Sequence, residues 1–227
     1  MSSPSAVRDA PEHIRDLLVR LHAESKQQEE SLTRDDYTND QSMHDLMRDK
    51  FIALNEDKAH YIYQLLRATG ATTIVEAGTS FGVSTIYLAL AACANAAVAS
   101  GKTPLVIATE YEPTKAARAR ENWQQCGSEI VSAIDLREGD LLDTLKINIM
   151  DVDFLLLDIW TPLALPTLKL VQPHLRHGAL VIADNTVSAA KNYQEFIDYV
   201  RAPDSGFIDT VVPFAGGLEV LVYAPSQ

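Results

Sequence analysis

The sequence predicts an α/β fold, in which a mostly parallel β-sheet carries helices on both of its faces. From residue 72 onward, short runs of apolar and β-branched residues alternate with stretches of helical spacing. Strands that are covered on both faces have such continuous apolar runs, and a helix between two strands makes them parallel. The last two runs are separated only by a short Ala-Gly-Gly link, which predicts an antiparallel hairpin at the end of the sheet.

The N-terminal part of the chain predicts a helical extension. Three of its segments place apolar side chains at the spacing of an amphipathic helix. These segments are residues 11–32, 40–54 and 57–68. A length of 227 residues favours one domain for an α/β chain. We therefore expect a single domain over residues 1–227, made of a helical extension (1–70) and an α/β core (71–227).

Seven strands are predicted for the core, five of them parallel and two forming the hairpin. They cover residues 72–77, 104–110, about 131–137, 152–158, 178–184, 207–214 and 218–224. Four helical stretches lie between them, over residues 83–94, 113–125, 162–174 and 189–201. This order predicts a Rossmann-like, seven-stranded, mostly parallel sheet with helices on both faces.

Composition restricts the kinds of partner. The formal net charge is −12 and no cluster of Lys and Arg offsets it, which argues against nucleic-acid binding and favours a neutral or cationic small molecule. The sequence has neither a run of about 18 apolar residues nor a secretory leader, so we expect a cytoplasmic protein with no membrane span. Its two cysteines are too few for a disulfide framework. A homodimer is left open.

The first predicted strand leads into a loop that contains two glycines. Gly78 and Gly82 let the backbone turn sharply and approach a ligand closely, and the helix that follows offers unpaired N–H groups to a carboxylate. A plain strand-to-helix turn is one alternative. A dinucleotide site is another, but it requires Gly-x-Gly-x-x-Gly with an acid about 20 residues later. The spacing here is Gly-x-x-x-Gly, and Glu76 stands before the first glycine.

Acidic residues also end the second and third predicted strands. Glu110 can accept hydrogen bonds from two ribose hydroxyls, and Tyr111 beside it can lie on an adenine face. Asp140 follows the third strand, where a polar side chain can meet the adenine amino group. Each acid alone could be an ordinary surface residue. Three strand ends in register are a stronger indication of a nucleoside site.

The fourth and fifth predicted strands end in Asp158 and in Asp184-Asn185. A carboxylate after such an apolar run is costly to bury unless it is paired or binds something. Two carboxylates and an amide oxygen are the ligands that Mg²⁺ prefers, with water and substrate oxygens completing its shell. Alternatively, Asp158 binds an ammonium group of the cofactor and Asp184-Asn185 caps the next helix.

Seven stretches of the chain resemble the class I S-adenosylmethionine (SAM)-dependent O-methyltransferases. The resemblance is to the catechol O-methyltransferase family and, slightly less, to the caffeoyl-CoA O-methyltransferases. It begins at about residue 55 and continues to the C-terminus. The stretches are NEDKAHYI, VEAGTSFGVST, ATEYEP, EGDLL, LLLDIW, VIADNT and GGLEVLVY.

The resemblance implies roles for individual residues. The implied SAM contacts are Leu54, Glu76, Gly78, Ser80, Ser84, Glu110, Tyr111, Asp140, Leu141, Asp158 and Ile159. The implied metal ligands, for Mg²⁺ or another divalent cation, are Asp158, Asp184 and Asn185. The implied catalytic residues are Asp158, Glu219 and Trp160: Glu219 fixes a second substrate hydroxyl and Trp160 lines the pocket. The implied activity is methyl transfer to a hydroxyl of a small catechol-like or other phenolic substrate, assisted by the metal.

The chain departs from the family at one position. Where the family has a lysine that acts as general base, this chain has Thr161, whose hydroxyl cannot replace an amine in that role. Either the metal alone acidifies the phenol, or Lys58, His60 or Lys191 takes part. A metal-independent SAM methyltransferase acting on an O, N or S atom, and a non-catalytic SAM-binding protein, remain as alternatives.

Overall fold

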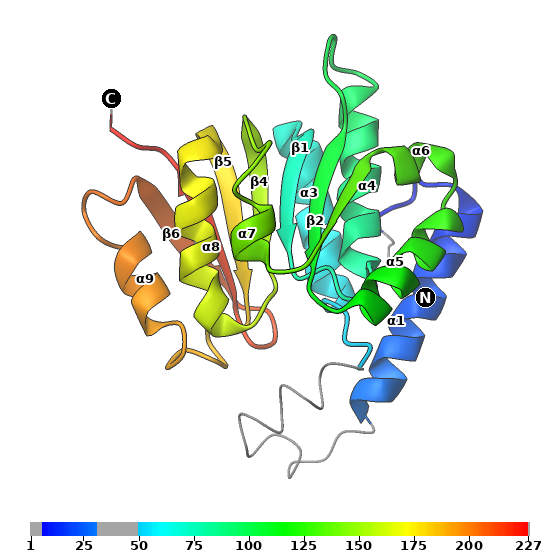
Figure 1. Cartoon of the computed structure of the whole chain (residues 1–227), viewed down its shortest axis with the longest axis horizontal. Coiled ribbons are helices and arrows are strands. Elements are labelled where there is room, and N and C mark those ends of the chain that lie inside the picture. Colours follow the sequence, from blue (N-terminus) through cyan, green and yellow to red (C-terminus); the bar gives the residue numbers. More distant parts are fainter. Residues whose placement is uncertain (1–5, 31–49, 227) are drawn as a thin grey trace.

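A seven-stranded sheet with helices on both faces forms the core of the structure (Figure 1). The structure is a computed structural model and describes residues 6–30 and 50–226. Along the sheet the strands follow the order β3-β2-β1-β4-β5-β7-β6. The α/β fold with its closing antiparallel hairpin, predicted from the alternation of strands and helices, is therefore confirmed.

Five strands pair in parallel, and β7 runs antiparallel to both of its neighbours, β5 and β6. The parallel strands are β1 (Thr73–Ala77), β2 (Leu105–Glu110), β3 (Ile134–Glu138), β4 (Val152–Leu157) and β5 (Leu175–Asp184). The antiparallel hairpin consists of β6 (Phe207–Val212) and β7 (Leu218–Tyr223), and β7 pairs with β5. Every residue of β4 is buried, which explains why its sequence is apolar apart from Asp153.

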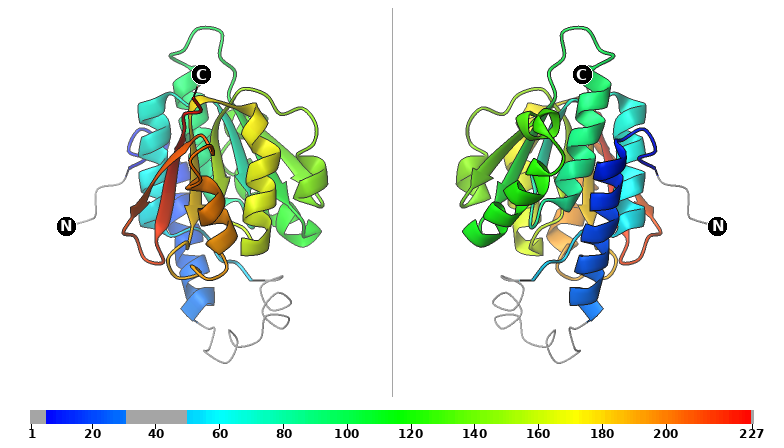
Figure 2. Two further views of the ribbon diagram at one scale, coloured as in Figure 1. Left: turned by 90° about the vertical axis from the view of Figure 1, so that its left-hand side faces the viewer. Right: turned by 90° about the vertical axis from the view of Figure 1, so that its right-hand side faces the viewer.

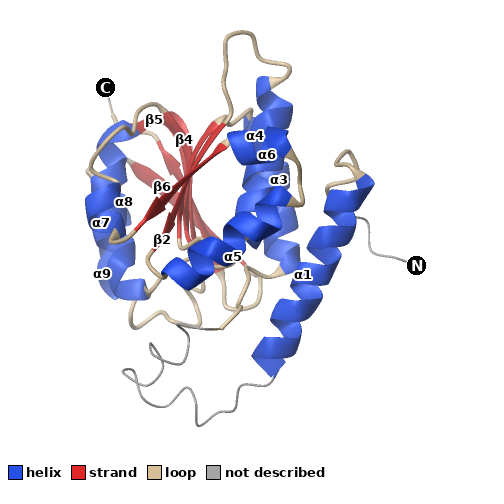
Figure 3. Cartoon of the chain, turned by 45° about the vertical axis from the view of Figure 1, so that its right-hand side comes forward, coloured by secondary structure: helices blue, strands red, loops and turns tan. Residues whose placement is uncertain are grey.

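The helices form two layers, one on each face of the sheet (Figure 3). One layer contains α1 (Glu12–Glu30), α3 (Glu56–Thr69), α4 (Val83–Ala96), α5 (Pro113–Gln124) and α6 (Ser128–Ser132). The other contains α7 (Leu141–Thr144), α8 (Ala164–Val171) and α9 (Gln194–Val200), with the short 3₁₀ turns η2 (Thr161–Leu163) and η3 (Gln172–His174) at the two ends of α8. None of the described helices combines the length and apolar character needed to span a membrane.

Helix α1 lies along the outside of the first layer, beside α4 (Figure 2). Its buried side chains Ile14, Leu17, Leu18 and Leu21 are those whose spacing predicts the helix. Helices α3 and α4 pack directly on one another and on the sheet, so α1 reaches the core through them.

The prediction of a helix over residues 40–54 is only partly open to comparison. Residues 40–49 lie outside the described part of the chain. Residues 50–54 are not helical. The backbone N–H groups of Phe51 and Ala53 donate to the side chains of Gln28 and Ser25 of α1 instead of to a helix of their own. This part of the prediction was wrong, because tertiary partners satisfy the backbone.

Other boundaries also differ from the expectation, among them that of the helix predicted over residues 189–201, which begins at Gln194. The third strand begins at Ile134, because residues 128–132 form the short helix α6. The fifth strand begins at Leu175, since an irregularity in the β4–β5 register lets Leu175 pair with Val152.

Candidate functional site

Four neighbouring strands end at one edge of the sheet, and the predicted site residues follow those ends. In this arrangement β2, β1, β4 and β5 are adjacent, so the residues after them come close together. The backbone connects the ends directly: Asp158 N–H donates to the carbonyl of Ala77, and Thr79 N–H donates to that of Thr109. The loop after β1 is therefore fixed to the strands on both of its sides.

The glycines of this loop are required by packing. Gly78 and Gly82 have positive φ angles of 95° and 78°. A Cβ on Gly78 would lie 2.1 Å from the backbone oxygen of Asp158, and one on Gly82 would lie 2.4 Å from the indole nitrogen of Trp123. The sequence attributes these glycines to a close approach of the ligand. In the structure their first neighbours are the strand end after β4 and helix α5.

Glu76 is fully buried beneath the loop. Its carboxylate accepts hydrogen bonds from Ser84 Oγ at 2.6 Å, Thr85 Oγ1 at 2.5 Å and Thr79 Oγ1 at 2.9 Å. Burial raises the pKa of Glu76, and the three hydroxyl donors oppose that rise. The resemblance implies that Glu76 contacts SAM. In this structure the carboxylate binds the loop and the start of α4, so it shapes the cofactor loop from below.

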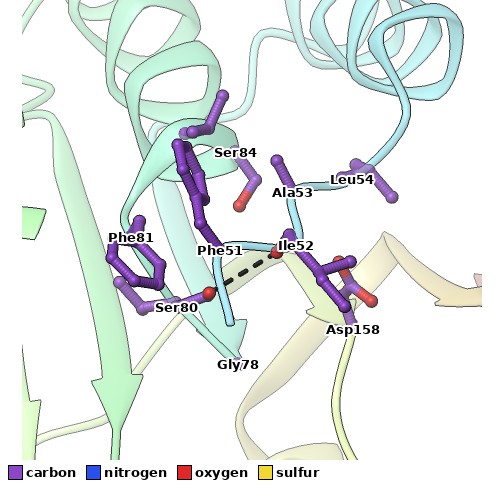
Figure 4. Close-up of a pocket in the computed structure, with 11 residues that line it drawn as sticks. Phe51, Ile52, Ala53, Leu54, Gly78, Ser80, Phe81, Ser84 and Asp158 are labelled. Carbon is purple, nitrogen blue, oxygen red and sulfur yellow. Dashed lines mark hydrogen bonds between the residues drawn. The ribbon is translucent and has the colours of Figure 1, made fainter. Parts of the chain in front are cut away.

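A small pocket lies over the loop (Figure 4). Its walls include Leu54, Gly78, Ser80, Ser84 and Asp158, five of the residues that the resemblance implies for SAM. The cavity volume is about 10 Å³, which is room for about one water molecule. The pocket is this small because residues 51–54 cross over it.

We call residues 51–54 the covering segment. Ser80 Oγ donates to the carbonyl of Ile52 at 3.4 Å, the bond drawn in Figure 4. The rings of Phe51 and Phe81 lie 4.6 Å apart between centroids. Of this segment, the resemblance implies only Leu54 as a cofactor contact. The sequence gives no sign that Phe51 contacts the loop, apart from the apolar character of the covering segment.

The nucleoside side of the predicted site is more open. Glu110, at the end of β2, accepts the N–H groups of Ser80 at 2.7 Å and Glu112 at 2.8 Å, and remains partly exposed. Tyr111 is 68% exposed, so its ring is available to a ligand. Asp140 caps α7 by accepting the N–H of Leu142.

The other two implied cofactor contacts flank this region. Ile159 is partly buried, and its side chain lies against Gly78. Leu141 is buried in the layer of α7 and α8. The structure thus places Ile159 beside Gly78 of the loop and Leu141 mainly in the core.

The acid at the end of β5, Asp184, is paired with a lysine that comes from helix α3. Lys58 Nζ lies 2.5 Å from Asp184 Oδ1, and the two side chains are 1% and 4% exposed. The same ammonium group is close enough to Asp158 to lower its pKa. Burial, with repulsion from Asp184 and Glu76, has the larger effect and raises the pKa of Asp158 well above its usual range.

The spacing of α3 contains a signal for this ion pair. Lys58 and Ile62 are four residues apart, so they lie on one face of the helix, and both are buried. A lysine on the apolar face of a predicted helix indicates a buried partner of opposite charge. The sequence names Lys58 only as one of three candidate bases, because its partner is 126 residues away.

The third implied metal ligand, Asn185, faces Asp184 with its nitrogen. Its Nδ2 donates to Asp184 Oδ2 at 3.1 Å, and its backbone N–H donates to Asp184 Oδ1 at 2.8 Å. The side-chain oxygen of Asn185 points the other way and lies 2.3 Å from the position of a Cβ on Gly216. The oxygen-rich donor set suits Mg²⁺ in its chemistry. The arrangement does not fit the metal, because Lys58 and the amide nitrogen already face both oxygens of Asp184.

The acid predicted to hold a substrate hydroxyl, Glu219, is paired within the protein. Its carboxylate accepts hydrogen bonds from Arg201 Nη2 at 2.9 Å and from Thr186 Oγ1 at 3.3 Å, and its side chain is 1% exposed. Arg201 also binds Asp209. Nothing in the spacing of the sequence identifies Arg201 as this partner.

The region after Asp158 holds the remaining predicted residues. Trp160 is 41% exposed at the start of the turn η2, and Thr161 is its first residue. Of the other candidate bases, His60 has its Nε2 atom 3.8 Å from Oε1 of Glu56, and Lys191 is exposed. The site therefore consists of a covered pocket over the loop, an open nucleoside side, and a buried lysine–carboxylate cluster.

The chain is similar to known methyltransferases in sequence and in fold. Residues 75–186 match the sequence profile of a family described as a methyltransferase domain. The chain is 26% identical to a catechol O-methyltransferase of Niastella koreensis over 148 residues, or 63% of this chain. That match spans 62% of the relative, less than two thirds of its length.

Solved structures with the same fold include two O-methyltransferases. One, from Bacillus cereus in complex with S-adenosylhomocysteine (SAH), is 19% identical with a TM-score of 0.67, over 94% of this chain and 91% of that one. The other, TomG from Streptomyces achromogenes in complex with SAM, is 18% identical with a TM-score of 0.68, over 94% of this chain and 90% of that one. At these identities the likeness establishes the fold.

Proposed function

We propose that this chain is a SAM-dependent O-methyltransferase that transfers the methyl group of SAM to a hydroxyl of a small phenolic molecule, as its similarity to a methyltransferase domain and to a catechol O-methyltransferase supports. The observation that carries the proposal is the meeting of Ser84, Asp158 and Glu110 around one loop at the carboxyl edge of the sheet. In open α/β sheets this edge is where ligands bind.

The residues present fit SAM. Helix α4 begins after Gly82 with no side-chain cap, so its first N–H groups can bind the carboxylate of the methionine part. Asp158 lies beside them in the pocket wall and can accept the ammonium group. Glu110 retains lone pairs for the ribose hydroxyls, and Tyr111 offers an exposed ring to the adenine.

SAM supplies a methyl group on a positively charged sulfur, which an oxygen can displace without a covalent enzyme intermediate. The chain contributes alignment of the two reactants and exclusion of water, which together can account for several orders of magnitude in rate. The covering segment, whose Phe51 and Leu54 are buried, is the part of the chain that closes the pocket over the loop.

A phenolic acceptor is supported by two features. The chain is similar to a catechol O-methyltransferase, with 26% identity over 148 residues. The exposed indole of Trp160 stands two residues after Asp158, where a flat aromatic acceptor can pack on it. The net charge of −12 disfavours nucleic acid and strongly acidic acceptors. A cytoplasmic location and a homodimer remain predictions from the sequence.

Assistance by Mg²⁺ is the part of the sequence-based prediction that the arrangement does not fit. Asp184 is engaged by Lys58 and by the amide nitrogen of Asn185. We therefore assign no step of the proposed reaction to a metal.

Calorimetry with SAM and SAH tests the proposed function first. We expect one site with a Kd in the micromolar range, and a loss of affinity of at least tenfold in Glu110→Ala, because that variant removes the ribose acceptor. The exposed Glu121→Ala on α5 is the matched control, and it should bind as the wild type does. No binding at millimolar SAM would reject the proposal.

A panel of catechols and simple phenols, assayed for SAH release, tests the acceptor class. Methylation of at least one member is expected. SAM binding without methyl transfer to any member would favour the non-catalytic SAM-binding alternative, and transfer only to amines or thiols would move the acceptor from oxygen to nitrogen or sulfur.

A further inference from the structure

Lys58 is a fully buried lysine at the edge of the sheet where the reaction is proposed to occur. Burying an ammonium group is unfavourable unless opposite charge compensates it. Here Asp184 Oδ1 accepts a hydrogen bond from Lys58 Nζ at 2.5 Å. Asp158 is the neighbour of Asp184 across the strand ends, because Leu157 pairs with Ala183. Two carboxylates and one ammonium group leave this cluster with one net negative charge when all three are ionised.

The helix holds Lys58 in this position. Lys58 is in the first turn of α3, and Ala59, Ile62 and Leu66 of the same helix are buried with it. Helix α3 packs against α4, whose residues are almost all buried. Withdrawing the ammonium group from Asp184 would therefore require moving the side chain through packed protein.

Asn185 presents the wrong atom for a cation. Its nitrogen faces Asp184, and its side-chain oxygen packs against the loop at Gly216. The backbone of Asn185 has φ 60°, and its N–H also donates to Asp184. A divalent cation at this position would require both the departure of Lys58 and the rotation of this amide.

We propose that the ammonium group of Lys58 takes the place of a divalent cation between Asp184 and Asp158, so that methyl transfer by this chain does not require a metal. This inference rests on the proposed function for the reaction itself, whereas the exclusion of the cation rests on the geometry of Lys58 alone. Lys58 acts as a positioning residue that keeps the two carboxylates compensated and in place. Of the two carboxylates, Asp158 is the one that lines the pocket.

Binding of Mn²⁺, followed by the electron paramagnetic resonance of the free ion, tests the exclusion directly. Mn²⁺ prefers the same oxygen ligands as Mg²⁺ and is visible to this method. We expect the wild type to bind no Mn²⁺ with a Kd below about 1 mM at this cluster. Lys58→Met, which keeps the length of the side chain and removes its charge, should bind Mn²⁺ at least tenfold more tightly.

Two variants make the result specific. Lys58→Met combined with Asp184→Asn should return to the weak binding of the wild type, because a ligand is lost. Lys102→Met removes an exposed lysine just before β2, at the opposite edge of the sheet, and should not change Mn²⁺ binding. Equal gains in Lys58→Met and Lys102→Met would reduce the effect to net charge and overturn the proposal.

If Lys58→Met does not fold, the wild type and Asp158→Asn decide the question. Binding of Mn²⁺ to the wild type with a Kd below about 1 mM that Asp158→Asn abolishes would overturn the proposal. Once an acceptor that the chain methylates is identified, turnover should stay within twofold of its initial value after EDTA treatment. A loss of turnover above tenfold that Mg²⁺ restores would also overturn the proposal. Failure of the proposed function is distinguishable, since it appears as absent SAM binding or absent methyl transfer while the Mn²⁺ experiment still reports on Lys58.

Discussion

A single carboxylate, Asp153, joins three strands at the edge of the sheet opposite to the site. It accepts the N–H groups of Thr72 at 2.7 Å and Thr73 at 2.9 Å, just before and at the start of β1, and forms an ion pair with Arg176 of β5. Burial raises the pKa of Asp153, but these donors outweigh burial and hold the pKa below its usual value. Asp153 therefore stabilises the fold in its ionised form.

Replacing Asp153 by Asn should lower the free energy of unfolding at pH 7 by roughly 1–3 kcal/mol, because the N–H groups and Arg176 lose their anionic partner. A depressed pKa gives stability that is present above the unfolded value of about 3.9 and disappears as the pH falls through the lower folded value. The difference between wild type and Asp153→Asn in urea unfolding should thus shrink between pH 5 and the acid limit. A constant difference down to pH 2 would contradict this account.

At the residue scale, the sequence identifies the acids of the site but not their partners. Glu110, Asp158 and Asp184 are recognisable because each follows an apolar strand, and parallel strands end together. The cations that bind such acids come from other elements. Lys58 reaches Asp184 from helix α3, and Arg201 reaches Glu219 from the end of α9. These pairings depend on tertiary packing, which no local spacing specifies.

At the element scale, glycines with a positive φ stand at two helix ends, Gly82 before α4 and Gly70 after α3, and their surroundings differ. Gly82 combines a positive φ with a close neighbour, the indole of Trp123, whose Nε1 donates to the Gly82 carbonyl at 2.9 Å. Gly70, which ends α3, has a positive φ of 68° and no atom near the position of a Cβ. A substitution at Gly70 therefore measures the cost of backbone strain alone, whereas one at Gly82 adds the cost of a steric clash.

Gly70→Ala should cost about 1 kcal/mol of stability from backbone strain alone. Gly82→Ala should cost about 2–4 kcal/mol, because the new methyl group also displaces Trp123. Guanidinium unfolding followed by circular dichroism measures both. Equal costs for the two variants would show that Trp123 yields without penalty.

Element types follow from the sequence better than element ends do. The strands and the helices that cover them are predicted by apolar runs and helical spacing. The helix expected up to residue 54 fails at residues 50–54, because Phe51 and Ala53 bond to side chains of α1. The five-residue helix α6 has too few residues to show a periodicity.

At the scale of the whole molecule, the two faces of the sheet carry separate apolar layers, and the site lies where the strands between them end. Strand β4 is buried throughout, whereas β6 at the edge of the sheet has no fully buried residue. We expect amide hydrogen exchange to be slowest in β1 and β4 and faster in β6.

Adding SAM should slow hydrogen exchange in residues 50–54 and 78–86, because the ligand would bind between the covering segment and the loop. The edge strand β6 should change little, since none of its residues lines that pocket. Peptide-level mass spectrometry measures both regions in one experiment. Protection confined to β6 would place the ligand elsewhere.

The covering segment has two sets of partners, and this has a thermodynamic consequence. Ser25 and Gln28 of α1 accept its N–H groups at 2.8 and 2.9 Å, whereas Phe81 and Ser80 hold it from the loop. Any ligand that repositions residues 51–54 must also alter the free energy with which α1 docks. By linkage the effect is reciprocal: a change that weakens the docking of α1 must alter the affinity of the pocket for its ligand by the same free energy.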